Sequence, residues 1–161
     1  MKPKMTKHKK AFKGRVSSKP IQSDVDFGEY GLRALEPSRI TAAQIYACKE
    51  VMLRRLRPLR GQLWTRIFPD IPVSEKPAEV RMGKGKGSVE YWCARVRPNT
   101  IIFEVGGIPV EAAQDALQQA SFKLGIKTKF EIKKEVDYKT LLARPMPSLL
   151  VDVPSKINIE S

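Results

Sequence analysis

A basic, glycine-rich stretch from Arg81 to Gly87 constrains this chain more than any other feature. Between Gly83 and Gly87 glycine alternates with lysine, so the stretch offers no apolar side chain to a core. Glycine backbone can approach a ligand closely, and exposed amide and ammonium groups are suited to phosphate oxygens. The sequence therefore predicts a surface loop that faces nucleic acid rather than a catalytic pocket. The candidate residues of this loop are Arg81, Met82, Gly83, Lys84, Gly85, Lys86 and Gly87.

The positive charge of the chain is unevenly distributed. The 161 residues carry a formal net charge of +13. Residues 1–19 contain eight lysine or arginine residues and no acidic residue, whereas residues 98–161 contain equal numbers of the two kinds. Solubility alone needs no such asymmetry, which is typical of a surface that binds a polyanion. The alternative is an ordinary basic protein with solvated lysines.

Residues 1–22 are predicted to form a basic arm. The large apolar side chains before Val16 are only Met1, Met5 and Phe12, which is too little apolar surface for independent folding. We expect the arm to become ordered on nucleic acid; the alternatives are a targeting segment, which would favour arginine and an amphipathic helix, or a plain disordered tail. The predicted phosphate-binding residues of the arm are Lys2, Lys4, Lys7, Lys9, Lys10, Lys13 and Arg15.

A helix is predicted over residues 42–57. Thr41 and Gln44 fit a capping box, and Pro58 ends the helix. An apolar stripe at helical spacing predicts the buried face: Ile45, Cys48, Met52 and Leu56. Arg54 and Arg57 lie well away from this stripe. Together with Arg55 they are candidates for phosphate contacts, with a solvated basic face as the alternative.

The remaining pattern predicts an α+β fold in which two helices pack on a mixed or antiparallel sheet. Residues 109–124 form the second helix, with three alanines on its packing face. Strands are expected at 63–68, 89–97, 100–105 and 128–133, while Pro69, Pro72 and Pro77 keep their segment extended or turning. We expect three regions: the arm (1–22), an α+β domain (23–136) and a C-terminal extension (137–161).

The chain lacks the residues that common enzyme sites need. Its single histidine, His8, lies in the arm, and Lys86-Gly87-Ser88 has the wrong order for a P-loop. No pair of carboxylates suggests acid–base catalysis, and the spacing of Cys48 and Cys93 fits neither zinc nor a disulfide. We predict no enzyme, no catalytic residue, no metal, no cofactor, no membrane span and no homo-oligomer.

Four aromatic residues of the predicted strands could stack on unpaired bases, although their strand patterns favour packing in the core. They are Trp64, Tyr91, Trp92 and Phe103.

Several stretches of the chain together resemble the L16 family of large-subunit ribosomal proteins. The most specific is Val80-Arg-Met-Gly-Lys-Gly-Lys-Gly87, followed by Val89-Glu-Tyr-Trp92. The others are Pro3–Lys7, Lys13–Arg15, Phe27-Gly28, Tyr30–Leu32, Leu63–Asp70 and Glu75–Pro77. The resemblance covers roughly residues 2–136, so it says nothing about residues 137–161.

This resemblance implies a structural role in the large ribosomal subunit. The arm and the first helix would contact ribosomal RNA (rRNA), and the loop at residues 81–87 would lie beside tRNA near the peptidyl-transferase centre. The extension at 137–161 would contact neighbouring ribosomal proteins. It suggests an organellar ribosome, mitochondrial in the first place, with the plastid and the bacterial cytoplasm as alternatives. The competing hypothesis is a free, regulatory nucleic-acid-binding protein.

Overall fold

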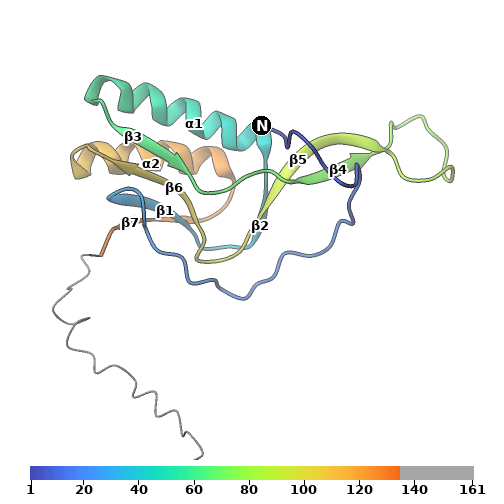
Figure 1. Cartoon of the computed structure of the whole chain (residues 1–161), viewed down its shortest axis with the longest axis horizontal. Helices are drawn as coiled ribbons and strands as arrows, with labels where there is room; N and C mark the ends of the chain where they lie inside the picture. The colour runs from blue at the N-terminus through green and yellow to red at the C-terminus, as the bar shows by residue number, and fades with distance from the viewer. Residues whose placement is uncertain (135–161) are drawn as a thin grey trace, which may run out of the picture.

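Two amphipathic helices form one layer of the structure, a computed structural model that describes residues 1–134. Helix α1 spans Ala42–Leu56 and helix α2 spans Val110–Leu124. The helices lie side by side against a sheet, as Figure 1 shows. The predicted capping box is present, because the Thr41 hydroxyl accepts from the Gln44 amide while the Gln44 side chain accepts from the Thr41 amide.

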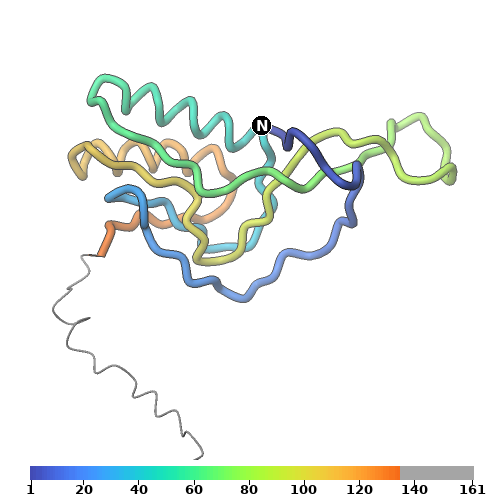
Figure 2. The backbone as a smooth tube through the Cα atoms, in the orientation of Figure 1, coloured from blue at the N-terminus to red at the C-terminus, as the bar shows by residue number. Residues whose placement is uncertain are grey.

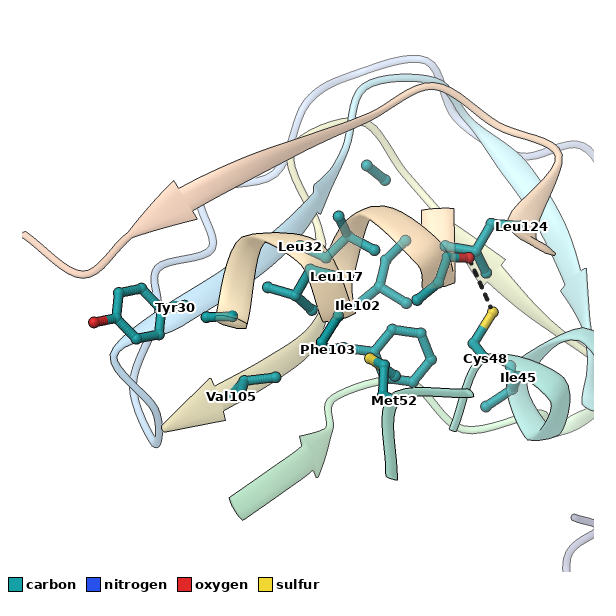
Figure 3. Close-up of a cluster of buried hydrophobic side chains, with 14 of the residues drawn as sticks. Tyr30, Leu32, Ile45, Cys48, Met52, Ile102, Phe103, Val105, Leu117 and Leu124 are labelled. Atoms are coloured by element: carbon teal, nitrogen blue, oxygen red, sulfur yellow. Dashed lines mark hydrogen bonds between the residues drawn. The ribbon is translucent and has the colours of Figure 1, made fainter. Parts of the chain in front are cut away.

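Both helices bury the faces that their sequences predict. The four stripe residues of α1 and the alanine face of α2 are all buried. The two helices meet where the Cys48 thiol donates to the Ala120 carbonyl over 3.4 Å, a contact drawn in Figure 3. Helix α2 ends at Gly125, whose φ of +65° is the left-handed conformation that glycine adopts readily.

Four antiparallel strands form the sheet beneath the helices, in the order β3-β6-β1-β7. The central strand β6 is buried along its whole length. Helices cover one of its faces, and the segment around Val25 lies against the other, with the Ile21 amide bonded to the Pro98 carbonyl. Figure 3 shows the core between helices and sheet, with Phe103 at its centre. The strand bounds are β1 Tyr30–Ala34, β3 Gln62–Thr65, β6 Ile101–Gly106 and β7 Thr128–Ile132.

Three further strands form a second antiparallel sheet, in the order β2-β5-β4. Their bounds are β2 Ser38–Thr41, β4 Ile71–Glu75 and β5 Ser88–Val96. Strands β4 and β5 pair as a long ribbon that extends away from the helices in Figure 1. This ribbon carries the glycine-rich loop at its tip.

A fully buried carboxylate, that of Glu104, joins the first sheet to the segment before β1. It accepts from the amides of Phe27 and Gly28, over 2.7 and 2.9 Å, and it pairs with Arg66. Arg66 also pairs with Asp26 over 2.9 Å. These bonds to the carboxylates raise the pKa of Arg66, although burial of the guanidinium opposes them as the largest single influence. A side chain at Gly28 would begin 2.6 Å from the Val105 carbonyl oxygen, so only glycine fits there.

The predicted fold class is confirmed, with two antiparallel sheets where one mixed or antiparallel sheet was expected. Strands β1, β2 and β4 were not predicted. Pro72 is tolerated in β4 because that strand lies at a sheet edge, where a missing N–H breaks no ladder. The strand expected at 63–68 ends at Thr65, beyond which the chain crosses to the second sheet. The C-terminal extension at 137–161 and the last residues of the predicted domain lie outside the described residues.

Candidate nucleic-acid interface

The glycine-rich stretch forms the exposed tip of the β4–β5 ribbon. Gly83 and Gly85 have φ angles of +90° and +79°, and Lys84 between them has a φ of 55°. A Cβ atom at either glycine would meet nothing within 4 Å, so the backbone conformation and not crowding requires glycine there. The Met82 side chain is 99% exposed. The predicted surface loop is therefore confirmed.

The two strands are held closely together where the loop leaves the β4–β5 ribbon. Glu75 pairs with Ser88 at the last step of the β4–β5 ladder. A Cβ atom at Gly87 would lie 2.3 Å from the Glu75 carbonyl oxygen, so the two strands can approach only because residue 87 is glycine. The Lys76 ammonium reaches across the loop to the Gly83 carbonyl. The exposed tip of the loop therefore extends from a well-defined base.

The basic arm lies against the second sheet without forming a helix or strand of its own. Arg39 of β2 donates to the carbonyls of Lys13 and Gly14. Arg95 of β5 donates to the carbonyls of Phe12 and Lys13, over 3.3 and 3.1 Å. Figure 2 shows the arm crossing the ribbon before it turns back towards β1. Since these bonds use backbone oxygens of the arm, they leave its lysine side chains available to a ligand.

The arm also touches the loop directly. The Lys10 ammonium donates to the Lys86 carbonyl over 2.7 Å, and the Lys86 ammonium donates to the Ala11 carbonyl. The same ammonium lies 6.0 Å from the centre of the Phe12 ring, at the limit for a cation–π contact. The contacts of Lys86 with Lys10, Ala11 and Phe12 thus join the loop to the arm, and we call residues 2–15 and 81–87 together the arm–loop surface.

Arg54 and Arg55 in the last turn of α1, and Arg57 directly after it, do not belong to that surface. They lie at the C-terminal end of α1, whereas the loop lies beyond the other end of the helix in Figure 1. A helix of this length spans roughly 22 Å. Arg55 pairs with Asp115 of α2, while the side chains of Arg54 and Arg57 have no ion-pair partner within residues 1–134. Arg54, Arg55 and Arg57 thus form a separate basic patch, the α1 patch.

The sequence interpretation missed Arg39 and Arg95, the residues that hold the arm. Register pairing places Arg39 directly opposite Arg95. Two like charges in that position normally destabilise a sheet, and here both find the same carbonyl acceptor. An arginine in each of two paired strands could have indicated this contact, but only if β2 had been recognised.

Neither thiol has the environment of a reactive or metal-binding cysteine. Burial raises the pKa of Cys48 to about 11, and burial also raises the pKa of Cys93, where Arg39 and Arg95 oppose the shift. The structured part of the chain contains no group of three potential metal ligands, and it contains no helix with the length and hydropathy of a membrane span.

The four aromatic residues are placed differently from one another. Phe103 is fully buried, and Trp64 and Trp92 are half-buried. Packing in the core is thus confirmed for Phe103, whereas Tyr91 is 40% exposed on β5.

Comparison with known proteins gives a consistent result. The profile of the family described as "Ribosomal protein L16p/L10e" matches residues 2–131. The chain is similar to proteins named "Large ribosomal subunit protein uL16" from three bacteria. It is 53% identical to that of Erythrobacter litoralis over 130 residues, which is 80% of this chain and 90% of the relative. The Methylocella silvestris protein is 54% identical over 131 residues (81% and 95%), and that of Sphingopyxis alaskensis is 55% identical over 130 residues (80% and 90%).

Proposed function

Given that this chain belongs to the ribosomal protein L16p/L10e family and is a structural constituent of the large ribosomal subunit, not an enzyme, we propose that its arm–loop surface binds large-subunit rRNA and tRNA. The arm would bind rRNA, and the loop would help to position tRNA near the peptidyl-transferase centre. The observation that carries this proposal is the joining of residues 2–15 and 81–87 into one basic surface.

The proposed mechanism is neutralisation and positioning. Lysine and arginine side chains bind phosphates with little regard to sequence, and such contacts fix the orientation of a protein on RNA. The arm bonds to the second sheet through its backbone, so its ammonium groups can point outward. The loop has no apolar anchor apart from the exposed Met82, which suits a segment that acts on a ligand and not on the core.

The α1 patch provides a second contact in this proposal. It lies far from the arm–loop surface, so the two would bind different segments of rRNA. The extension at 137–161 is proposed to contact neighbouring ribosomal proteins. That part of the proposal derives from the balanced charge of the C-terminal half of the sequence.

Sedimentation tests the proposed function. A tagged chain expressed in its native cells should travel with intact large subunits and should stay there through a moderate salt wash. A chain found in light fractions would support the competing hypothesis of a free regulatory binder, as would release by salt with the steep dependence of a simple electrostatic complex. Deletion of residues 2–15 should reduce incorporation, and full occupancy of the truncated chain would count against the role of the arm.

The compartment is proposed separately. Residues 132–161 extend beyond the matched family region, and such an extension would suit an organellar ribosome, mitochondrial in particular. The relatives named above are bacterial. Fractionation of the native cells decides the point, because a mitochondrial chain would sediment with organelle ribosomes and a bacterial one with those of the cytoplasm.

A further inference from the structure

The two lysines of the glycine-rich loop have different surroundings. The Lys86 ammonium donates to the Ala11 carbonyl and lies near the face of Phe12. The Lys86 carbonyl in turn accepts from Lys10. Lys84 is exposed, and its ammonium makes no hydrogen bond or ion pair within residues 1–134. Identical side chains two positions apart are therefore in different situations, one bonded to the arm and one not.

We infer that Lys86 is a positioning residue that braces the loop against the arm, while Lys84 is the lysine of the loop that contacts the polynucleotide. The brace is an intramolecular contact and does not depend on any ligand. The assignment of Lys84 rests on the proposed function.

The geometry around Lys86 explains why a brace is needed. All three residues from Gly83 to Gly85 have positive φ angles, and no side chain packs over the two glycines. The backbone of the tip is thus free to take several directions. On one side, Lys76 bonds to the Gly83 carbonyl and limits this freedom. On the other side, the reciprocal contacts between Lys86 and the segment Lys10–Phe12 do so.

The arm can serve as the fixed end of this brace because the second sheet holds it. Arg39 and Arg95 bond to carbonyls within Phe12–Gly14, directly after the residues that Lys86 contacts. The direction of the loop is therefore coupled to the docking of the arm. Lysines of the arm that bind rRNA would, through the same backbone, stabilise the loop in one orientation towards tRNA.

Backbone amide order parameters of the free, full-length chain test the brace. A rigid amide has an order parameter of about 0.85 and a flexible one has less than about 0.6. We expect the order parameters of Gly83 and Gly85 to stay above about 0.6 in the wild type and in Lys84→Ala, and to fall below about 0.6 in Lys86→Ala. Phe12→Ala should lower them less, because the hydrogen bond from Lys86 to the Ala11 carbonyl remains. Lys86→Arg should recover the wild-type values, because a guanidinium can also donate to a carbonyl and stack on an aromatic ring.

Two outcomes would overturn the brace. One is equal order parameters in Lys86→Ala and Lys84→Ala, and the other is a wild-type loop already below about 0.6. These variants change exposed loop or arm residues, so the spectrum of the core reports directly that each chain is folded.

The assignment of Lys84 needs large subunits that contain each variant. Lys84→Ala should slow tRNA accommodation. When Lys84→Ala is combined with the arm variant Phe12→Ala, the two effects should add. Lys86→Ala combined with Phe12→Ala should be no worse than Lys86→Ala alone, because Lys86→Ala already removes the contact with the Phe12 ring. Normal accommodation with Lys84→Ala would refute the contact with tRNA but leave the brace intact, so failure of the two ideas can be told apart.

Discussion

Arg39 and Arg95 face each other across the β2–β5 pair and donate to the same acceptor, the carbonyl of Lys13. Two guanidinium groups in adjacent positions repel each other, and within residues 1–134 neither of them pairs with a carboxylate. Instead of a carboxylate, a backbone carbonyl oxygen of the arm accepts hydrogen bonds from both guanidinium groups. The second sheet thus presents two guanidinium groups that hold the backbone of the arm.

Replacing Arg95 with alanine should release the arm from the second sheet. Arg95 supplies two of the hydrogen bonds to the arm. Bonds to charged groups contribute about 1.5–3 kcal/mol when buried, and we expect about 1 kcal/mol at this exposed site. Trypsin should then cleave after Lys13 and Arg15 about fivefold faster, as followed by mass spectrometry, while the free energy of unfolding in urea falls by at most about 1 kcal/mol.

The matched control is Arg97→Ala. Arg97 is an exposed cation two residues away, with no side-chain hydrogen bond inside residues 1–134. The Arg97→Ala substitution removes one positive charge, as Arg95→Ala does, but removes no hydrogen bond to the arm. Equal acceleration of cleavage by the two variants would mean that net charge, and not the Arg95 bonds, controls the arm.

The α1 patch should contribute to RNA affinity through Arg54 and Arg57. Removing one side chain that neutralises a phosphate is expected to reduce the slope of log affinity against log salt by about 0.7–0.9. The double variant Arg54→Ala/Arg57→Ala should therefore lower that slope by roughly 1.5 in binding to a large-subunit rRNA fragment. Arg55→Ala should change the slope less than the removal of Arg54 or Arg57 alone, because Arg55 is already paired with Asp115. An equal effect of Arg55→Ala would show that the ion pair opens on binding.

Loss of the Glu104 carboxylate should destabilise the fold strongly. Glu104 is fully buried and holds two amides as well as Arg66. Removing one partner of a buried ion pair costs about 3–5 kcal/mol, and we expect the lower end for Glu104→Ala because Arg66 keeps Asp26. Glu111→Ala, in the exposed first turn of α2, should cost about 1 kcal/mol or less. Similar urea midpoints for the two variants would contradict this account.

The buried thiol of Cys48 should make stability depend on alkaline pH. Burial raises its pKa in the folded state from 9.0 to about 11. Between these two pKa values the thiol of the unfolded chain loses its proton and the thiol of the folded chain keeps it. The contribution of the Cys48 thiol to the free energy of unfolding is therefore fully present below pH 9 and is lost as the pH rises towards 11. The free energy of unfolding should fall by up to about 1.4 kcal/mol per pH unit relative to Cys48→Ala. Parallel pH profiles for the two chains would refute the prediction.

The helices could be predicted from the sequence because their signals are local. The Thr41–Gln44 capping box, the stripe ending at Leu56, and Gly125 after α2 all belong to single segments, and the structure confirms them. The short strands β1, β2 and β4 have no such signal. Strands β1 and β2 are stabilised by pairing with β6 and β5, which are distant along the chain, and β4 by pairing with β5 across the loop at residues 76–87.

The candidate site was predictable in part for the same reason. The alternating glycines by themselves predict an exposed loop with no side chain in the core, and the structure confirms this at residues 83–86. The separation of the α1 patch from the arm–loop surface could not be read from composition, since composition shows that both are basic but not where they lie in space. Contacts such as Lys86 to Ala11 depend on the path of the arm, which no local pattern encodes.

A cryo-electron microscopy map of the large subunit containing this chain tests the central claim most directly. We expect rRNA phosphates within about 4 Å of ammonium groups along residues 2–15, and the loop at 81–87 directed towards the tRNA sites. An arm and a loop that both face bulk solvent, with no polynucleotide beside them, would contradict the account.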